Sequence, residues 1–276
     1  MTNALLFSFN TSTQISIFDV LKRTMKNLGI IGCGWLGSHI AERLKNQYKI
    51  FTTTTTEAKV QEFENKGFHT TIVSFPDEIN PEMKAWEVLE QLDAIIITIP
   101  FSGTHGKQIS MKERQKNLLT FLGDFKGQMF LMSSTGVYPQ TENDFKEDDL
   151  SPENVESENF VLEKFPQTNI LRLAGLMGDN RLLMNYNISN LDQLVNHIHY
   201  ADICSVVEKM LAENSQSKVY NLVAPVHPNK EEVISAQKDL PFLGERTSVG
   251  RTISAEKLMK ELEFEFQYPD PRYFHL

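Results

Sequence analysis

The feature that most constrains the fold is a glycine-rich turn between an apolar run and a helical pattern. Residues 27–39 read NLGIIGCGWLGSH, in which Gly32, Gly34 and Gly37 have the spacing G-x-G-x-x-G. The first glycine permits a tight turn, the second lets the backbone approach a diphosphate, and the third lets a helix pack on a strand. In this context the spacing predicts the first turn of a dinucleotide-binding βαβ unit.

The same segment contains the candidate ligand-binding residues. The amides of Trp35 and Leu36 lie at the start of the predicted helix, where backbone N–H groups can hold an anion. We therefore predict that these two residues bind the cofactor together with Gly32, Gly34 and Gly37. The alternative is a glycine turn that serves only packing.

Strand and helix patterns alternate after this turn. The predicted strands cover 49–53, 68–74, 93–99, 128–133, 169–173 and 218–223, and the predicted helices cover 58–66, 82–91, 107–125, 153–165 and 201–213. Regular alternation predicts an α/β fold with a doubly wound, mainly parallel Rossmann sheet and right-handed crossovers.

The pattern divides the chain into three parts. We expect residues 1–24 to be a weakly structured extension upstream of the true start at Met25, and residues 25–224 to form the Rossmann domain. Within that domain, residues 176–191 are expected to contribute to the substrate side. Residues 225–276 contain two further helical patterns and are predicted to form a small lobe over the carboxyl ends of the strands.

The net charge and the number of cysteines limit which kinds of partner the protein is expected to bind. The 276 residues carry a formal net charge of −9, which disfavours sequence-independent binding to nucleic acid or anionic lipid. No apolar run approaches the roughly 18 residues that span a bilayer. Two cysteines, Cys33 and Cys204, are too few for a disulfide framework or a zinc site. We expect a cytoplasmic protein with a small-molecule partner and no nucleic acid, membrane or metal.

The end of the second strand is unusual for a dinucleotide site. NAD-binding proteins usually place an acidic residue there, but this strand enters Thr52–Thr56 and the first acid is Glu57. Hydroxyl groups can donate to a 2′-phosphate without repelling it, so the pattern favours NADP over NAD, with Thr53 and Thr54 as contacts. The nearest cation is Lys59 and no arginine is close. The threonines are equally explained by strand propensity alone.

Further segments carry a family resemblance. They are LMSSTGVYP at 131–139, NILRLAGLMG at 169–178 and NHIHYAD at 196–202. Together with the glycine turn they resemble the extended short-chain dehydrogenase/reductase superfamily, in its nucleoside-diphosphate-sugar epimerase/dehydratase branch. The resemblance covers residues 27 to about 224, and the segments at 220–225 and 263–271 resemble an atypical bacterial subgroup.

The resemblance implies roles for several residues. A Ser or Thr after the fifth strand binds the reacting oxygen of the substrate in this family, which indicates Ser134, four residues before Tyr138, with Thr135 as the alternative. Pro100 and Ser133 are implied as cofactor contacts. Members often pair through the helices expected near 107–125 and 153–165, which implies a homodimer.

The chain departs from the family at its catalytic pair. The family uses Tyr-x-x-x-Lys on the helix before the sixth strand, where the tyrosine exchanges a proton and the lysine lowers its pKa and binds the nicotinamide ribose. The corresponding positions here hold Val155 and Asn159. Two substitutes are conceivable: Tyr138 as an acid and Glu158 as a base. The alternatives are a pocket-lining ring and a solvated helix face.

Two functions therefore stay open. The first is an NAD(P)-dependent epimerase or reductase with altered proton transfer, acting on a small substrate such as a nucleotide sugar. The second is a non-catalytic dinucleotide-binding sensor or scaffold.

Other conspicuous polar residues receive mainly structural interpretations. We expect Asp202 to cap the helix that follows His199, and Arg172, inside an apolar strand, to pair with a carboxylate or carbonyl groups. His105 is interpreted as a loop histidine. Arg181 follows a glycine turn and is a candidate for contact with a substrate phosphate.

Overall fold

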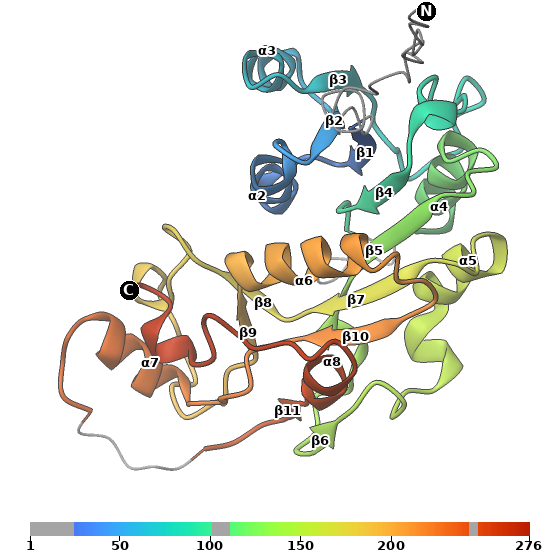
Figure 1. Ribbon diagram of the computed structural model, residues 1–276. Coiled ribbons are helices and arrows are strands. Elements are labelled where there is room, and N and C mark those ends of the chain that lie inside the picture. Colours follow the sequence, from blue (N-terminus) through green and yellow to red (C-terminus); the bar gives the residue numbers. More distant parts are fainter. Residues whose placement is uncertain (1–24, 101–110, 243–247) are drawn as a thin grey trace, which may run out of the picture.

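The computed structural model describes residues 25–100, 111–242 and 248–276. Its centre is a seven-stranded sheet in the order β10-β7-β5-β4-β1-β2-β3, and every neighbouring pair is parallel (Figure 1). The strands are β1 Lys26–Ile31, β2 Tyr48–Thr54, β3 His69–Ile72, β4 Ala94–Ile97, β5 Gln128–Ser134, β7 Asn169–Leu173 and β10 Val219–Leu222. The predicted Rossmann α/β fold is therefore confirmed.

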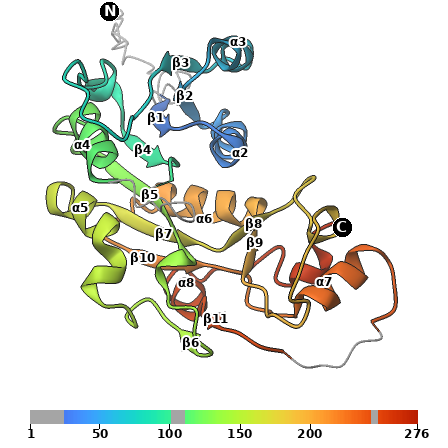
Figure 2. The same cartoon turned by 180° about the vertical axis from the view of Figure 1, so that it is seen from behind.

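Helices cover both faces of this sheet. The helices are α2 Trp35–Leu44, α3 Glu57–Asn65, α4 Met111–Phe121, α5 Glu156–Lys164, α6 Tyr200–Ala212, α7 Lys230–Gln237 and α8 Glu256–Glu261. Side chains of α2, α3 and α6 belong to one hydrophobic core, and those of α4 and α5 belong to the core on the opposite face. Figure 2 shows α4 and α5 from behind.

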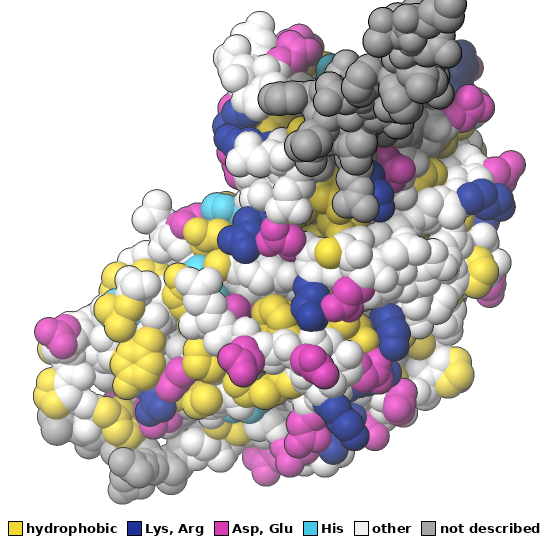
Figure 3. Space-filling model, in the orientation of Figure 1, with side chains coloured by type: hydrophobic (Ala, Val, Ile, Leu, Met, Phe, Trp, Pro, Cys, Tyr) yellow, Lys and Arg dark blue, Asp and Glu magenta, His cyan; other side chains and the backbone are white. Residues whose placement is uncertain are grey.

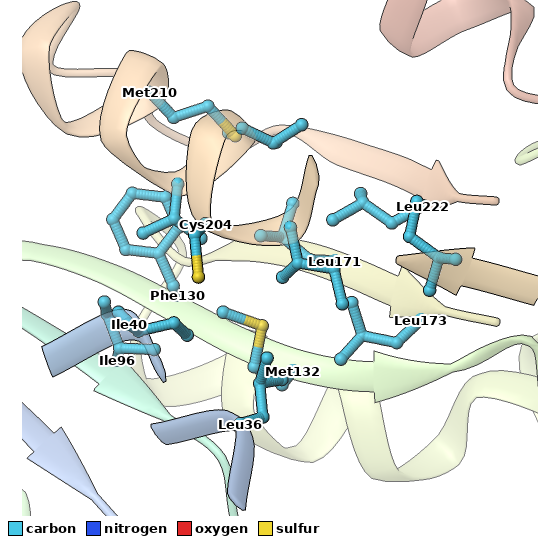
Figure 4. Close-up of a cluster of buried hydrophobic side chains, with 14 of the residues drawn as sticks. Leu36, Ile40, Ile96, Phe130, Met132, Leu171, Leu173, Cys204, Met210 and Leu222 are labelled. Carbon is cyan, nitrogen blue, oxygen red and sulfur yellow. The ribbon is translucent and has the colours of Figure 1, made fainter. Parts of the chain in front are cut away.

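The larger core fixes the helix that begins at the glycine turn. Leu36 and Ile40 of α2 and Cys204 and Met210 of α6 belong to this core, and all four side chains are buried (Figure 4). Since these apolar contacts hold the first turns of α2 against the sheet, the preceding loop has a defined position.

Short elements complete the carboxyl edge of the sheet. They are β6 Asp144–Phe145, β8 Gly175–Met177, β9 His197–His199 and β11 Thr252–Ile253, with 3₁₀ turns at Leu89–Gln91, Thr135–Val137, Pro152–Val155, Leu183–Asn185 and Pro271–Tyr273. β8 pairs with β9, and β6 pairs with β11. With two or three residues each, these strands are too short to show an alternating pattern in the sequence.

Residues 225–276 divide among three hydrophobic clusters, one of which contains Phe274 together with Leu182 and Ala224. Ile253, Leu258 and Phe264 join the same core as α2 and α6. Val233 of α7 instead packs in a small cluster with Leu183. Figure 3 shows hydrophobic side chains gathered over α7 and the chain end, whereas acidic and basic side chains are mixed over α6 and α8.

One predicted helix is absent. Residues 82–91 form turns and the 3₁₀ segment Leu89–Gln91 instead of a helix. Trp86 explains the difference, because its backbone N–H donates to Phe121 O (2.9 Å) and its indole N–H donates to Thr71 Oγ1 (3.1 Å). Its ring also stacks on Phe121 with centroids 5.3 Å apart. In a continuous helix the Trp86 N–H would bind a carbonyl four residues earlier in the same helix. Here it binds Phe121, and the indole is held by Thr71 and Phe121.

No helix in the described ranges is long and apolar enough to cross a membrane.

Candidate dinucleotide-binding site

The three positions of the loop differ in how strongly the surrounding structure requires a glycine. Gly32 has φ +84°, and a Cβ there would lie 2.3 Å from Ile99 Cγ2, so both backbone and space require glycine. A Cβ on Gly37 would lie 3.3 to 3.4 Å from Ile30, Thr98 and the Gly32 carbonyl. At Gly34 the nearest atom would be 3.8 Å away. The chain's own packing therefore requires the first glycine and favours the third, but leaves open space at the second.

Two hydroxyl groups hold the peptide of Gly32. Its N–H donates to Thr53 Oγ1 (2.8 Å), and its carbonyl accepts from Thr98 Oγ1 (2.6 Å). The Cys33 N–H also donates to Thr53 O (2.9 Å). Thr53 lies in β2 and Thr98 directly follows β4, the strands on either side of β1, so the turn is fixed from both sides.

This geometry changes the role of Thr53. The residue is 1% exposed and its hydroxyl faces the loop, so it acts as a positioning residue instead of a direct ligand contact. Thr54 is also buried, whereas Thr55 and Thr56 are exposed beyond the end of β2. Thr98 was not identified from the sequence, because a threonine at the end of a buried apolar strand has no distinctive pattern.

The thiol inside the loop is buried. Burial raises the pKa of the Cys33 thiol to about 11. Its Sγ lies 3.9 Å from Ser38 Oγ. The side chain therefore fills space under the loop as a neutral group.

The serines at the end of β5 make different contacts. Ser133 Oγ donates to Glu158 Oε1 (2.6 Å). Ser134 Oγ accepts from the Gly136 N–H (3.0 Å) and caps the short 3₁₀ turn that follows. Ser134 is partly exposed and keeps its own proton available for donation, whereas Thr135 is buried.

Tyr138 and Glu158 belong to one buried network. Arg172 pairs with the Glu158 carboxylate at 2.9 Å and donates through Nη1 to Tyr138 Oη (3.0 Å) and Glu147 O (2.9 Å). Tyr138 in turn donates to Asn221 Oδ1 (2.7 Å). The expectation that Arg172 pairs with a carboxylate or carbonyl groups is confirmed, and both kinds of partner are present.

This network determines whether Tyr138 and Glu158 can replace the missing catalytic pair. Tyr138 is 2% exposed, and burial raises the pKa of its phenol despite the nearby arginine. Glu158 is 3% exposed, so it does not lie on a solvated helix face. Both side chains are directed at protein partners and not at the open edge of the sheet, an arrangement that does not favour proton exchange with a ligand.

The positions of the missing catalytic pair lie at the start of α5. Val155 precedes the helix and is half-buried. Asn159 is half-buried, and its amide is 3.5 Å from the Pro152 carbonyl. Among the cofactor contacts implied by resemblance, Pro100 is exposed just beyond β4. His105 lies outside the described residues.

The N-cap of α6 is His199 and not Asp202. His199 caps α6, because its Nδ1 accepts from the Ala201 N–H (3.2 Å). The expectation that Asp202 caps this helix is wrong: its carboxylate accepts from the backbone N–H groups of Gln267 (2.8 Å) and Tyr268 (3.0 Å). Asp202 is fully buried and ties the C-terminal tail to α6.

Arg181 lies against the glycine loop. Its guanidinium carbon is 4.1 Å from the ring centroid of Trp35, the first residue of α2. This contact joins a segment expected on the substrate side to the cofactor loop. The sequence does not predict it, because the two residues are distant along the chain.

The sheet order and the glycine loop define a Rossmann-fold protein with the architecture of NAD-dependent epimerases and dehydratases, so the fold implied by the resemblance is confirmed. Residues 27–150 match the family model described as the NAD binding domain of 6-phosphogluconate dehydrogenase. The chain is similar to Protein YeeZ of Escherichia coli strain K12, with 28% identity over 271 residues, covering 90% of this chain and 98% of YeeZ.

Solved structures share this architecture at low sequence identity. The Bordetella bronchiseptica enzyme WbmG in complex with NAD has a TM-score of 0.70 and 13% identity, covering 92% of this chain and 93% of WbmG. UDP-N-acetylglucosamine 4-epimerase from Bacillus cereus has a TM-score of 0.62 and 15% identity, covering 90% of this chain and 96% of the epimerase.

Proposed function

We propose that the chain binds a nicotinamide dinucleotide with its diphosphate over the loop from Gly32 to Gly37. The observation that carries this proposal is the open space at Gly34, where the protein's own atoms do not require a glycine. A ligand whose phosphates approach the backbone accounts for it. The match of residues 27–150 to an NAD binding domain supports the same assignment.

The loop has the donors that a diphosphate needs. The amides of Trp35 and Leu36 lie in the first turn of α2, where backbone N–H groups have no partner within the helix. That turn contains no acidic side chain. The helix dipole adds partial positive charge at the same place. When bound, the cofactor would supply a hydride donor or acceptor at the carboxyl edge of the sheet.

Gly34→Ala tests this assignment. We expect the variant to keep the wild-type unfolding midpoint, because its Cβ meets no atom closer than 3.8 Å. We expect its affinity for NAD and NADP to fall at least roughly tenfold, because the methyl group occupies the phosphate position. Isothermal titration calorimetry measures the affinity. A variant that binds both dinucleotides as tightly as wild type would refute the site.

We propose NADP as the preferred dinucleotide. Thr55 and Thr56 present exposed hydroxyl groups beyond β2, and Glu57 is the first acid after the strand. Parallel titrations with NAD and NADP decide the choice, and tighter binding of NAD would overturn it.

For the reaction, we propose epimerase or reductase chemistry on a small substrate of the nucleotide-sugar type. The partly exposed Ser134 hydroxyl supports this proposal, because it can donate to a substrate oxygen while accepting from Gly136. UDP-N-acetylglucosamine 4-epimerase has the same fold. Turnover of a panel of nucleotide sugars with NAD(P)⁺ or NAD(P)H tests it, and Ser134→Ala is expected to lower kcat.

A second candidate is a non-catalytic dinucleotide-binding sensor or scaffold. The burial of Tyr138 and the pairing of Glu158 with Arg172 favour it, since neither group is free to exchange protons with a ligand. Thermal stabilisation by the dinucleotide without turnover of any panel member would select this function over the enzyme.

We also propose a cytoplasmic homodimer without nucleic acid or membrane partners. The two cysteines are buried and free, which fits a reducing compartment. The helices α4 and α5 are joined by Lys112 and Glu156 (3.1 Å), and the family resemblance implies pairing through this region. Size-exclusion chromatography with light scattering tests the dimer, and a monomer at micromolar concentration would contradict it.

A further inference from the structure

Arg181 differs from the other described arginines in having no polar partner. Its guanidinium lies over the Trp35 ring at 4.1 Å, and no hydrogen bond or carboxylate partner reaches it among the described residues. Four other arginines pair with carboxylates, and Arg251 donates to three backbone carbonyls. A half-buried cation with unused donors next to a phosphate-binding loop requires an explanation.

The surrounding contacts hold Arg181 in place. Gly178 and Arg181 close a tight turn through two backbone hydrogen bonds, Gly178 N–H to Arg181 O (3.1 Å) and Arg181 N–H to Gly178 O (2.9 Å). Between them, Asp179 pairs with His39 of α2 at 2.9 Å. The His39 ring stacks on Tyr200 with centroids 3.9 Å apart.

These contacts form a two-point attachment. Trp35 and His39 are four residues apart on α2 and therefore lie on one face, one turn apart. Arg181 contacts the first and Asp179 contacts the second. Because the turn is docked at both positions, Arg181 stays beside the N-terminus of α2 and does not sweep freely through solvent.

We propose that Arg181 binds a nucleotide diphosphate at the glycine loop, with Trp35 as its platform. A guanidinium stacked on an aromatic face keeps the N–H groups along its edge available for bidentate bonds to phosphate oxygens. It adds a full positive charge to the partial charge of the helix N-terminus. The proposal rests on the proposed function, since the same loop holds the diphosphate.

Two different ligands could supply the diphosphate that Arg181 binds. The diphosphate belongs either to the nicotinamide dinucleotide or to a nucleoside-diphosphate substrate that approaches from the side of residues 176–191. Both present the same pair of phosphates to the guanidinium, so the experiment includes an arm for each.

Arg181→Gln removes the charge, and Arg181→Lys keeps the charge without the planar fork. Arg43→Gln is the matched control, because Arg43 lies at the far end of α2 and pairs with Glu208. Calorimetric titrations use NAD, NADP, UDP in the presence of saturating dinucleotide, and adenosine as a probe without phosphate. Unfolding midpoints of all variants verify that each is folded.

We expect Arg181→Gln to weaken binding of the diphosphate-containing ligand roughly 10- to 100-fold, the usual effect of losing a charge-assisted bidentate contact. Arg181→Lys is expected to recover part of the loss. Arg181→Gln should bind adenosine with wild-type affinity. Arg43→Gln should bind every ligand with wild-type affinity. A loss with the dinucleotides identifies the cofactor as the source, and a loss with UDP alone identifies the substrate.

These titrations distinguish a failure of the proposed role of Arg181 from a failure of the proposed function. If wild type binds a dinucleotide and Arg181→Gln binds every ligand with unchanged affinity, the role of Arg181 is wrong and the proposed function stands. If wild type binds neither dinucleotide nor UDP, the proposed function fails, and the role of Arg181 fails with it.

Tryptophan emission gives an independent readout. The chain has two tryptophans, so Trp86→Phe leaves Trp35 as the single emitter. We expect diphosphate binding to change Trp35 emission, because the guanidinium over its ring acquires an anionic partner. The same change in a Trp86→Phe, Arg181→Gln double variant at saturating ligand would contradict the proposed contact.

Discussion

At the scale of single residues, the site depends on side chains that never touch a ligand. The hydroxyls of Thr53 and Thr98 bind the backbone N–H and C=O of Gly32, which has a positive φ that glycine adopts without strain. A buried peptide without partners costs free energy, so these hydroxyls stabilise both the fold and the loop geometry.

Thr53→Val tests this role. The variant keeps the shape of the side chain and removes the acceptor for the Gly32 N–H, so we expect a loss of about 1–3 kcal/mol in the free energy of unfolding. Dinucleotide affinity should fall as well, and Thr53→Ser should restore both. Urea denaturation and titration measure the two effects. Equal behaviour of the valine and serine variants would show that the hydroxyl is unimportant.

The buried pair of Glu158 and Arg172 supports a second prediction. Their side chains are 4% and 6% exposed, so Glu158→Gln leaves a guanidinium in the interior without its counter-charge. Breaking a buried pair in this way typically costs about 3–5 kcal/mol.

Glu156→Gln on the same helix is the control, because Glu156 and Lys112 are 71% and 64% exposed. Removing such a surface pair typically costs about 1 kcal/mol or less. Urea denaturation compares the two variants. Similar losses in both would mean that burial of the Arg172 pair has no energetic consequence.

The two residues also show what the sequence reveals about single positions. An arginine inside an apolar strand must have a partner, so the pairing of Arg172 was predictable. The identity of that partner was not, because Glu158 lies on another element and its spacing resembles that of an exposed helix residue. Tyr138 was misleading because a tyrosine in the turn after a strand has the same sequence pattern whether its ring faces a ligand or the interior.

At the scale of elements, the strands and helices with strong periodicity were predicted and those fixed by tertiary contacts were not. β7 has the predicted bounds, Asn169–Leu173. The helix expected at 82–91 is absent because Trp86 contacts Phe121 and Thr71. A periodic pattern reports which face is apolar, and it does not report a long-range anchor that interrupts the helix.

The segment from β9 to α6 predicts a dependence of stability on pH. Burial lowers the pKa of His197 and of His199 to about 4, below the ordinary value of 6.5. Between these values the unfolded chain binds protons that the folded chain does not, so stability is complete above about pH 6.5 and declines as the pH falls toward 4. Protonation of His199 would also remove the Nδ1 acceptor that caps α6.

His199→Asn separates this effect from the titration of carboxylates. Asparagine is a good N-cap and does not titrate, so we expect a smaller decline in unfolding free energy between about pH 6.5 and 4.5 than in wild type. His69→Gln is the control, because His69 is exposed on β3. Urea denaturation across this range measures the slopes. A slope for His199→Asn as steep as that of wild type would contradict the prediction.

At the scale of the whole molecule, the site lies where the strand order reverses. β1 pairs with β2 on one side and β4 on the other, and the helices that follow these two strands, α2 and α4, belong to the cores on opposite faces of the sheet. The glycine loop after β1 therefore lies at the switch point of the strand order, where open α/β sheets bind ligands. The alternation of strands and helices predicts this arrangement. The packing of residues 225–276 was less predictable, because a short helix such as α8 carries no information about which core it joins.

The final prediction concerns whether those residues unfold with the sheet. Leu258 is fully buried in the core that also contains α2 and α6, so Leu258→Ala should cost about 2–5 kcal/mol. Trp35 and Trp86 both lie in the first half of the chain and report on the Rossmann domain. If the molecule is one cooperative unit, the urea midpoint of tryptophan emission shifts in Leu258→Ala although the substitution is in the C-terminal region. Leu240→Ala, at a position that is 57% exposed, should leave that midpoint unchanged. An unshifted midpoint in Leu258→Ala would instead mean that residues 225–276 unfold independently, as a lobe separate from the sheet.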